Sequence, residues 1–397
     1  MLTHFFILLL KLVISVNGMH ALLSNDHDVL PGAWQTNAYF HLLEGKQVAV
    51  AGNHTSMVSG THLVDTLLSS GINVVKVFSP EHGFRGRAAD GEHIDDSTDP
   101  QTGVPIVSLY GNNRRPTREQ LAVVDVILFD MQDVGTRFYT YISTMTYIME
   151  EAAVKGIPVI ILDRPNPNGH YVDGPLLEPE HASFVGLHPV PVVHGMTIGE
   201  YALMVNGEGW LKDERRADLR VIPVANYSRE ERYSLPVAPS PNLPNMRAVY
   251  LYPSLCFFEG TSVSLGRGTD KPFQQFGHPD LPASAYPHQF TPESRRESVN
   301  PPQIGEECKG LDLGQLDEDD LARKKRINLE YLLEAYRHFP DKSRFFNTYF
   351  EQLAGTSRLR KQIEAGYSAS AIRATWENDL EAFRQLRSAY LLYPEEN

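Results

Sequence analysis

The chain has 397 residues, of which 42% are hydrophobic and 21% are charged, as is usual for a globular protein. This length can accommodate two domains of ordinary size. The formal net charge of −13 argues against a nucleic-acid partner, because binding to phosphates needs a basic face. The two cysteines, Cys256 and Cys308, are too few for a disulfide scaffold, although they could pair in an oxidising compartment.

An apolar run covers residues 5–16 near the N-terminus and is interrupted by Lys11. The run is shorter than the roughly 20 residues that a transmembrane helix needs. Small and polar residues follow it, as they do after the apolar part of a signal peptide. We therefore expect a signal peptide over residues 1–25, no integral membrane segment in the mature chain, and a periplasmic or secreted protein.

Apolar strand patterns alternate with helical periodicity over the first half of the chain. Runs rich in Val, Ile and Leu predict strands at residues 46–52, 73–79, 104–111, 124–130 and 157–163. The helical patterns at 61–71 and 139–156 each end on a glycine, a common residue after a helix C-terminus. Continuously apolar strands are typical of a parallel sheet that is buried on both faces. The fold class predicted for residues 40–235 is therefore α/β, with a Rossmann-like, doubly wound parallel sheet.

The composition changes near residue 235. The segment LPVAPSPNLPNM is rich in proline and predicts a linker or a rigid wall. Residues 281–325 are polar, and residues 327–397 show helical spacing. These patterns predict a second, smaller α+β domain over residues 236–397 that closes a cleft against the first.

A polar cluster follows each predicted strand. The clusters read AGNHTS, SPEHGFRG, LYGNNRRP, DMQDVGTRFYTY and DRPNPNG in chain order. Loops are polar in most proteins, but these clusters also combine arginines, aromatic residues and carboxylates. In open α/β sheets the ligand crevice lies at the carboxyl ends of the strands, so we expect the clusters to form one site.

Several familiar motifs are missing from the sequence. It contains no G-x-G-x-x-G after the first strand, no Walker loop, no H-E-x-x-H and no G-x-S-x-G. Their absence argues against dinucleotide enzymes, P-loop NTPases, zincin proteases and ordinary α/β-hydrolases. No cofactor is predicted.

The run FSPEHGFRGRAADGEHIDD, residues 78–96, holds the densest group of charges. Its acidic and histidine side chains could supply nitrogen and oxygen ligands to a metal; these are Glu81, His82, Glu92, His93, Asp95 and Asp96. Their spacing matches no known metal cage, and the two arginines among them would repel a divalent cation. We therefore predict no metal.

A pair of carboxylates is the better interpretation of this run, because glycoside hydrolysis commonly uses two of them. Glu81 follows a buried strand between Pro80 and Gly83, which would fix its backbone. Burial beside Phe78 and Phe84 would raise its pKa towards that of a general acid. We predict Glu81 as the catalytic acid and Glu92 as the second candidate, with His82 and Arg85 in support.

Other clusters supply candidate binding residues. Arg137 could bind a substrate carboxylate bidentately, and Tyr139 could stack on a sugar, although both also fit a helix N-terminus with core aromatics. Neutral groups that could bind hydroxyls or acetamides are Asn53, His54, Asn166 and Asn168. Carboxylates after the fourth and fifth strands are Asp130, Asp133 and Asp163, the last of which could instead pair with Arg164. In the second domain, Glu259 and Arg267 could close the site or only pair with each other.

Long stretches of the chain resemble a known family. The stretches SPEHGFRG, DMQDVGTRFYTY, LDRPNPNG, PSPNLPNM, YPSLCFFEGTSVSLGRGTDKPFQ and AYLLY are similar to those of the NamZ (YbbC-like) exo-β-N-acetylmuramidases, formerly a domain of unknown function. The resemblance extends from about residue 40 to 394. It implies a Rossmann-like domain, an auxiliary domain, and a site in the cleft between them.

The resemblance also implies an activity. The chain would release N-acetylmuramic acid from the non-reducing end of peptidoglycan fragments of the MurNAc-GlcNAc type, in cell-wall turnover or recycling. It implies a catalytic glutamate, which the motif SPEHG assigns to Glu81. The lactyl carboxylate of this sugar needs a cation, for which the candidates are Arg85, Arg137 and Arg267.

Two other functions are compatible with the same residues. One is a non-catalytic muropeptide-binding protein of the cell envelope, which would keep the cleft without turnover. The other is a metal-dependent cell-wall hydrolase, such as a deacetylase, which a chelator would inhibit. The sequence predicts no particular oligomeric state.

Overall fold

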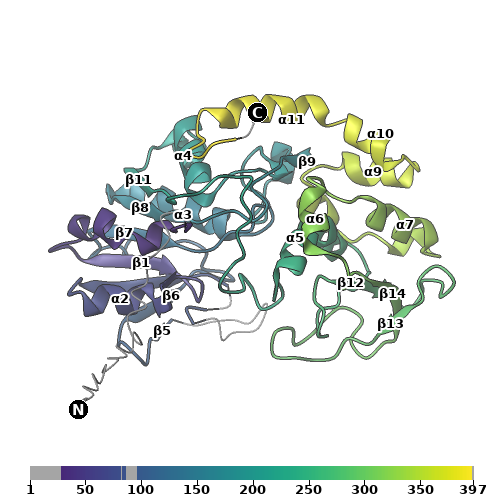
Figure 1. The fold of residues 1–397 in the computed structure, drawn as a ribbon, viewed down its shortest axis with the longest axis horizontal. Helices are drawn as coiled ribbons and strands as arrows, with labels where there is room; N and C mark the ends of the chain where they lie inside the picture. Colours follow the sequence, from purple (N-terminus) through teal and green to yellow (C-terminus); the bar gives the residue numbers. More distant parts are fainter. Residues whose placement is uncertain (1–27, 82, 86–95, 396–397) are drawn as a thin grey trace, which may run out of the picture.

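The computed structural model describes residues 28–81, 83–85 and 96–395. Its first domain is built on a seven-stranded sheet with the order β11-β8-β7-β1-β4-β6-β5 (Figure 1). The strands are β1 (Val48–Gly52), β4 (Val74–Ser79), β5 (Ser97–Thr98), β6 (Pro105–Ser108), β7 (Val126–Asp130), β8 (Val159–Leu162) and β11 (Leu219–Ile222). Strand β5 pairs antiparallel with β6, and all other neighbours are parallel.

The order of the six parallel strands is that of the Rossmann fold. Chain order starts at β1, proceeds outward through β4 and β6, and then continues on the other side of β1 through β7, β8 and β11. The predicted fold class is thus confirmed, and all five predicted strands are present. The sixth, β11, was not predicted because it is an edge strand in which only Ile222 is fully buried.

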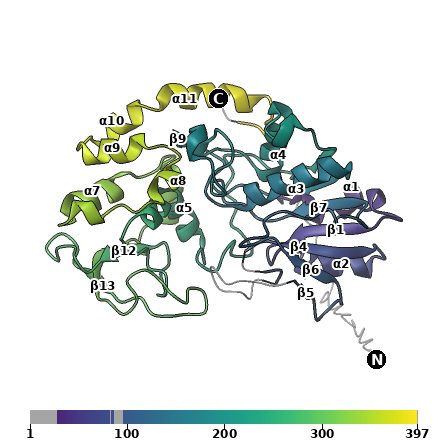
Figure 2. The same ribbon diagram turned by 180° about the vertical axis from the view of Figure 1, so that it is seen from behind.

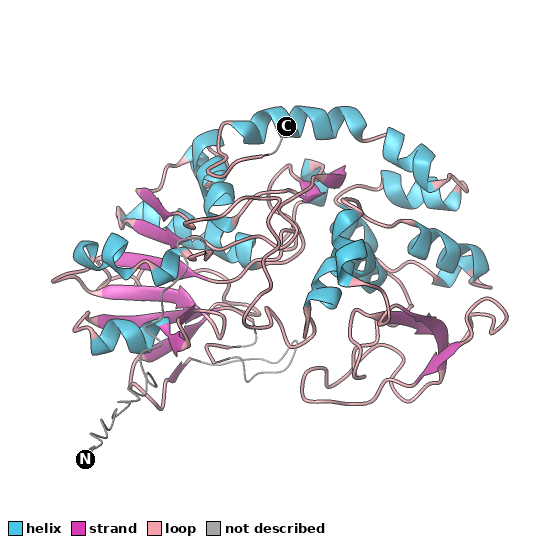
Figure 3. Ribbon diagram, viewed as in Figure 1, coloured by secondary structure: helices cyan, strands magenta, loops and turns pink. Residues whose placement is uncertain are grey.

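Both faces of the sheet are covered, which explains the continuous apolar strands. Along β1 and β7, successive side chains alternate between two separate hydrophobic cores. The core on one face includes residues of α3 (Tyr141–Lys155) and α4 (Ile198–Glu208), and that on the other includes residues of α2 (Leu63–Ser69) and α1 (Thr36–Tyr39). Figure 3 shows these helices on either side of the strands.

Local sequence signals explain where α3 ends and where α4 begins. Helix α3 ends at Lys155 and is followed by Gly156, whose φ of 67° suits a residue without a Cβ. Helix α4 begins with a reciprocal capping box, in which the side chains of Thr197 and Glu200 bond to each other's backbone N–H. The domain also contains two small hairpins, β2–β3 (Met57–Val58, Thr61–His62) and β9–β10 (Asp173–Leu176, Pro191–Val193).

The second domain combines a small antiparallel sheet with short helices, which confirms the predicted α+β class. Its sheet has the order β12-β14-β13, with strands Gln275–His278, Cys308–Asp312 and His288–Phe290. Its helices are α5 (Met246–Leu255), α6 (Glu318–Arg323), α7 (Glu330–His338), α8 (Phe350–Ala354), α9 (Arg358–Glu364), α10 (Ala369–Ala374) and α11 (Glu377–Ser388). Cys256 and Cys308 are both buried and unpaired.

Short 3-10 helices complete the secondary structure. They are η1 (Gly32–Trp34), η2 (Phe40–Leu42), η3 (Pro179–His181), η4 (Lys212–Glu214), η5 (Cys256–Gly260) and η6 (Lys342–Arg344). In the part of the chain that the structure describes, no helix has both the length and the apolar character needed to cross a membrane.

The C-terminal segment returns to the first domain. Helix α11 leads away from α9 and α10 and ends near α4, as both ribbon views show (Figures 1 and 2). Arg387 donates to the carbonyl oxygen of Gly195 at 2.7 Å, and the hydroxyl of Tyr393 donates to Asp163. The end of the chain therefore contributes to the core of the first domain.

Arg137 is completely buried and joins the two domains. Its Nη1 donates to the carbonyls of Pro175 and Val190 at 2.9 and 2.7 Å in the first domain. Its Nη2 donates to Leu353 and Ala354 at 3.0 and 2.7 Å in the second. A Cβ at Gly355 would lie 2.5 Å from Nη2, so this close approach requires glycine there.

We expect Arg137→Met to lower the free energy of unfolding by about 3 kcal/mol or more, because four buried carbonyl oxygens would lose their donor. Denaturant unfolding followed by tryptophan fluorescence measures this change. Arg323→Met in α6, where the side chain is 65% exposed, is the control and should change stability by less than about 0.5 kcal/mol. Equal midpoints for Arg137→Met and the wild type would contradict the structural role.

Candidate active site

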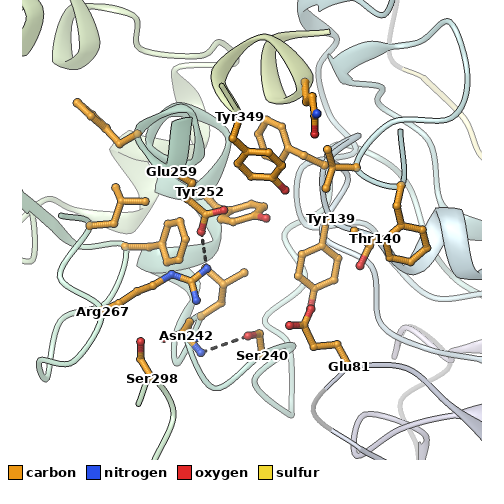
Figure 4. A pocket seen from close by; sticks show the side chains of 18 of the residues that line it. Glu81, Tyr139, Thr140, Ser240, Asn242, Tyr252, Glu259, Arg267, Ser298 and Tyr349 are labelled. Atoms are coloured by element: carbon orange, nitrogen blue, oxygen red, sulfur yellow. Dashed lines mark hydrogen bonds and ion pairs between the residues drawn. The ribbon is translucent and has the colours of Figure 1, made fainter. Parts of the chain in front are cut away.

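A cavity of about 580 Å³ lies between the two domains. Both domains and the proline-rich segment between them line it (Figure 4). The polar and charged lining residues are Glu81, Tyr110, Arg114, Tyr139, Thr140, Tyr141, Ser183, Ser240, Asn242, Tyr252, Glu259, Thr261, Arg267, Ser298, Asn300, Tyr349 and Gln352. The wall is completed by Phe138, Phe184, Val185, Leu243, Phe258, Val263, Leu265, Phe273 and Pro302.

Glu81 reaches the cavity from the turn that follows β4. The N–H of Gly83 donates to the carbonyl of Pro80 at 3.2 Å, and Gly83 adopts a φ of 73° that favours glycine. The side chain of Glu81 is half-buried and points towards Tyr139 (Figure 4). Phe78 and Phe84, which were expected to surround it, are buried in the two hydrophobic cores instead.

Tyr139 and Tyr141 form the wall beside Glu81; Tyr139 lies in the loop after β7, and Tyr141 is the first residue of α3. The hydroxyl of Tyr139 donates to the carbonyl of Pro239 at 2.7 Å, and that of Tyr141 accepts from Asn53 at 2.7 Å. Burial raises the pKa of both phenols well above the usual value, and the charge of Glu81 adds to this shift. Both are therefore neutral hydroxyl groups, and Asn53 acts behind the wall by holding Tyr141.

Glu259 and Arg267 form an ion pair on the opposite wall, in the second domain. Both line the cavity, and Arg267 also lies over the ring of Phe273 at 5.2 Å. Burial raises the pKa of the neighbouring Tyr349, and the negative charge of Glu259 contributes. From the sequence, Glu259 and Arg267 could either close the site or only pair with each other. In the structure they line the cavity and also form an ion pair.

Three predicted binding residues, Arg85, Asp130 and Arg137, are not part of the cavity lining. Each is instead bound to other groups of the protein, through ion pairs or through hydrogen bonds to main-chain carbonyls. Arg137 cannot act as a clamp for a ligand carboxylate, because its four contacts are to main-chain carbonyls and no part of it is exposed. Arg85 bridges two carboxylates, Asp65 and Asp99. Asp130 is buried against Arg164 with contacts of 2.6 and 2.9 Å.

The remaining polar candidates hold the framework of the first domain and its junction with the segments that follow it. The Nε2 of His54 bonds to the carbonyl of Ala238 at 2.9 Å. Asp163 accepts from Thr197, Gly199 and Tyr393, and burial raises its pKa to about 6. Asn166 and Asn168 donate to the carbonyls of Met196 and Val134, at 2.8 and 2.9 Å. These contacts fix loops at the sheet edge and leave the cavity to other residues.

Asp133 is buried behind the tyrosine wall, next to His194. Its Oδ2 accepts from the N–H of Gly135 at 2.6 Å and lies 3.9 Å from the Nε2 of His194. The Nδ1 of His194 accepts from the N–H of Met196, which places the ring proton on Nε2, facing Asp133. Burial raises the pKa of Asp133 to about 7 and lowers that of His194 to about 3. The pair is therefore neutral in mildly acidic solution.

The metal hypothesis concerned residues that are mostly outside the described part of the chain, namely His82, Glu92, His93 and Asp95. Asp96 is described, and its carboxylate accepts from the N–H of Ser108 at 3.0 Å. Within the described residues, Glu178, Glu180 and His181 come close enough to hold an ion. They are not part of the cavity lining, and Glu178 pairs with Arg358 at 2.8 Å.

Several lining residues were not predicted. Arg114 and Tyr110 belong to LYGNNRRP, which was recognised only as a polar cluster after a strand. Ser240 and Asn242 belong to the proline-rich segment, in which no side chain was assigned a role. Tyr349 lies in a part of the second domain that showed only helical periodicity, so no signal in the sequence identified it.

The fold and the site together define a two-domain α/β protein with a polar, aromatic-walled cavity that contains two carboxylates, Glu81 and Glu259. The chain belongs to the exo-β-N-acetylmuramidase NamZ family. The model of the family's N-terminal region matches residues 48–247, and that of its C-terminal region matches residues 250–393.

Proteins of Bacillus subtilis and Bacteroides fragilis are similar to this chain. Peptidoglycan β-N-acetylmuramidase NamZ of Bacillus subtilis (strain 168) is 39% identical over 381 residues, covering 89% of each chain. The crystal structure of a DUF1343 family protein from Bacteroides fragilis is 50% identical, with a TM-score of 0.87, and covers 93% of this chain and 100% of that chain. A second DUF1343 structure from the same organism is 27% identical, with a TM-score of 0.76 and the same coverage.

The buried carboxyl of Asp133 should make stability depend on pH. Its pKa of about 7 in the folded protein lies above the ordinary value of 3.8, so between these values the folded state binds more protons than the unfolded state. The free energy of unfolding should therefore fall as the pH rises from about 4 to about 7, by up to about 1.4 kcal/mol per pH unit from this group.

Asp133→Asn stays neutral, so it should flatten this dependence and unfold at a higher denaturant concentration than the wild type at pH 8. Denaturant titrations at pH 5 to 8 measure the effect. Asp213→Asn, at an exposed position, should retain the wild-type slope. A slope that is unchanged in Asp133→Asn would show that Asp133 is ionised throughout this range.

Proposed function

We propose that the protein is a glycoside hydrolase that releases N-acetylmuramic acid from the non-reducing end of peptidoglycan-derived saccharides of the MurNAc-GlcNAc type. Membership of the NamZ family and the 39% identity to a peptidoglycan β-N-acetylmuramidase support this activity. In the site itself, the main support for this activity is Glu81, whose half-buried carboxyl group lies in the wall of the interdomain cavity.

Glu81 is proposed as the general acid that protonates the leaving glycosidic oxygen. The turn from Pro80 to Gly83 fixes its backbone, and its carboxyl group points into the cavity beside Tyr139. Glu92, the second candidate, lies outside the described residues, so the cavity geometry bears on Glu81 alone. Glu259 is less suited to donate a proton, because Arg267 already binds one of its oxygens.

The opposite wall supplies the second carboxylate that such chemistry commonly uses. Cleavage of a glycosidic bond passes through a transition state with positive charge at the sugar ring. Glu259 faces the cavity from the second domain, and its carboxylate, although paired with Arg267, would stabilise that centre through its closer approach to the sugar ring. The tyrosine, serine and asparagine side chains of the lining would bind the sugar's hydroxyl and acetamido groups.

We propose that the protein acts outside the cytoplasm, in turnover or recycling of the cell wall. The proposal rests on the apolar run at residues 5–16 and on the family's peptidoglycan-directed activity. Residues 1–25, the expected signal peptide, lie outside the described residues. N-terminal sequencing of the protein recovered from its native host would test the cleavage.

Substitution of Glu81 tests the activity and the role of the acid together. With a MurNAc-GlcNAc disaccharide, Glu81→Gln should lower kcat by about 10²- to 10⁴-fold, the usual contribution of general acid catalysis. With a dinitrophenyl N-acetylmuramide the loss should be far smaller, because that leaving group departs without protonation. Product release followed by chromatography and by absorbance measures both.

Glu119→Gln is the matched control, because Glu119 is fully exposed and outside the cavity lining. It should retain wild-type rates on both substrates. Equal losses by Glu81→Gln on the two substrates would remove Glu81 from the role of acid. No release from either substrate by the wild-type protein would refute the proposed activity itself.

A further inference from the structure

Arg114 reaches the cavity from the loop after β6, and β6 lies next to β4, the strand that precedes Glu81. Strands β4 and β6 are parallel, and Ser79 pairs with Ser108 at their carboxyl ends. The chain beyond each of these residues therefore leaves the sheet at the same edge. Glu81 follows two residues after Ser79, and Arg114 follows six residues after Ser108; both line the same cavity.

Two contacts hold the guanidinium of Arg114 against the cavity wall. Its Cζ lies 4.3 Å from the centre of the Phe184 ring, and its Nε donates to the carbonyl of Gly111 at 3.0 Å. Phe184 also lines the cavity and packs against Tyr147. The stacking limits the freedom of a side chain that is otherwise exposed, and thereby lowers the entropy cost of binding an anion.

Two other arginines of this region, Arg115 and Arg267, already have carboxylate partners. Arg115 pairs with Glu150 and Glu151, and Arg267 on the opposite wall pairs with Glu259. No carboxylate among the described residues pairs with Arg114. Its two terminal nitrogens are therefore available to an anionic group of a ligand in the cavity, without breaking an existing ion pair.

We infer that Arg114 binds the lactyl carboxylate of an N-acetylmuramoyl residue and so selects this sugar over N-acetylglucosamine. The inference rests on the proposed function. The lactyl ether is the group that distinguishes the two sugars, and it carries one carboxylate. A guanidinium presents two parallel N–H groups that match a carboxylate bidentately. Of the three cations considered from the sequence, Arg85 and Arg137 do not line the cavity, and Arg267 is neutralised by Glu259.

The test compares the acid with its methyl ester, which lacks the charge, and with the N-acetylglucosaminide, which lacks the whole lactyl ether. An aryl β-N-acetylmuramide, its lactyl methyl ester and the aryl β-N-acetylglucosaminide are assayed with the wild type, Arg114→Gln and Arg114→Lys. For the acid, Arg114→Gln should lower kcat/KM by about 10- to 150-fold, the usual effect of losing a hydrogen bond to a charged group. The rate on the methyl ester should change by less than about threefold. On the acid, the kcat/KM of Arg114→Lys should lie between those of the wild type and Arg114→Gln, because lysine keeps the positive charge but cannot donate two parallel hydrogen bonds.

Arg118→Gln is the control, because Arg118 is an exposed residue of the same loop that does not line the cavity. It should retain the preference of the wild type for the acid over the ester. Equal losses by Arg114→Gln on acid and ester, or no loss on the acid, would overturn the inference.

Failure of the proposed function gives a different result, in which the wild type cleaves none of the three substrates. Calorimetry with free N-acetylmuramic acid and its methyl ester then tests Arg114 by itself. Tighter binding of the acid by the wild type, lost in Arg114→Gln, supports the inference. Equal binding of acid and ester by the wild type contradicts it.

Discussion

The interdomain cavity depends on the buried guanidinium of Arg137. A cation without a carboxylate partner is costly to bury, and here main-chain carbonyls of both domains compensate for that cost. Two of these carbonyls belong to α8 and two to the β9–β10 region. The guanidinium therefore has all four of its hydrogen bonds only when the domains are docked. The walls of the cavity therefore have a fixed relation to each other before any ligand arrives.

Within this frame the two domains contribute different charges to the cavity. The first domain provides Glu81 and Arg114 from neighbouring strand ends, and the second provides Glu259 and Arg267 as an ion pair. The tyrosines between them are kept neutral by burial. A cavity with this distribution suits a ligand that is mainly uncharged, carries one anionic group, and develops positive charge during reaction.

Local patterns in the sequence were sufficient to predict the framework. Five apolar runs predicted five strands, and the glycines at 71 and 156 marked the ends of helices. The role of Arg137 could not be predicted, because GTRFYT is equally compatible with a ligand clamp and with a buried contact to residues more than 200 positions away. Arg114 was not predicted because its contact also lies far away in the sequence. Its stacking on Phe184 depends on a loop 70 residues further along the chain, which periodicity does not reveal.

The contact between Tyr393 and Asp163 has a consequence for how the protein is made. Asp163 is buried at the end of β8, and one of its hydrogen-bond donors is supplied 230 residues later by the final segment of the chain. During synthesis the sheet can form long before that donor leaves the ribosome, and until then the carboxylate is incompletely compensated. The first domain is therefore completed last, although most of its sequence is synthesised first. A chain that terminates before residue 393 would lack the tyrosine hydroxyl that bonds to Asp163, so a truncation at the C-terminus would destabilise the N-terminal domain.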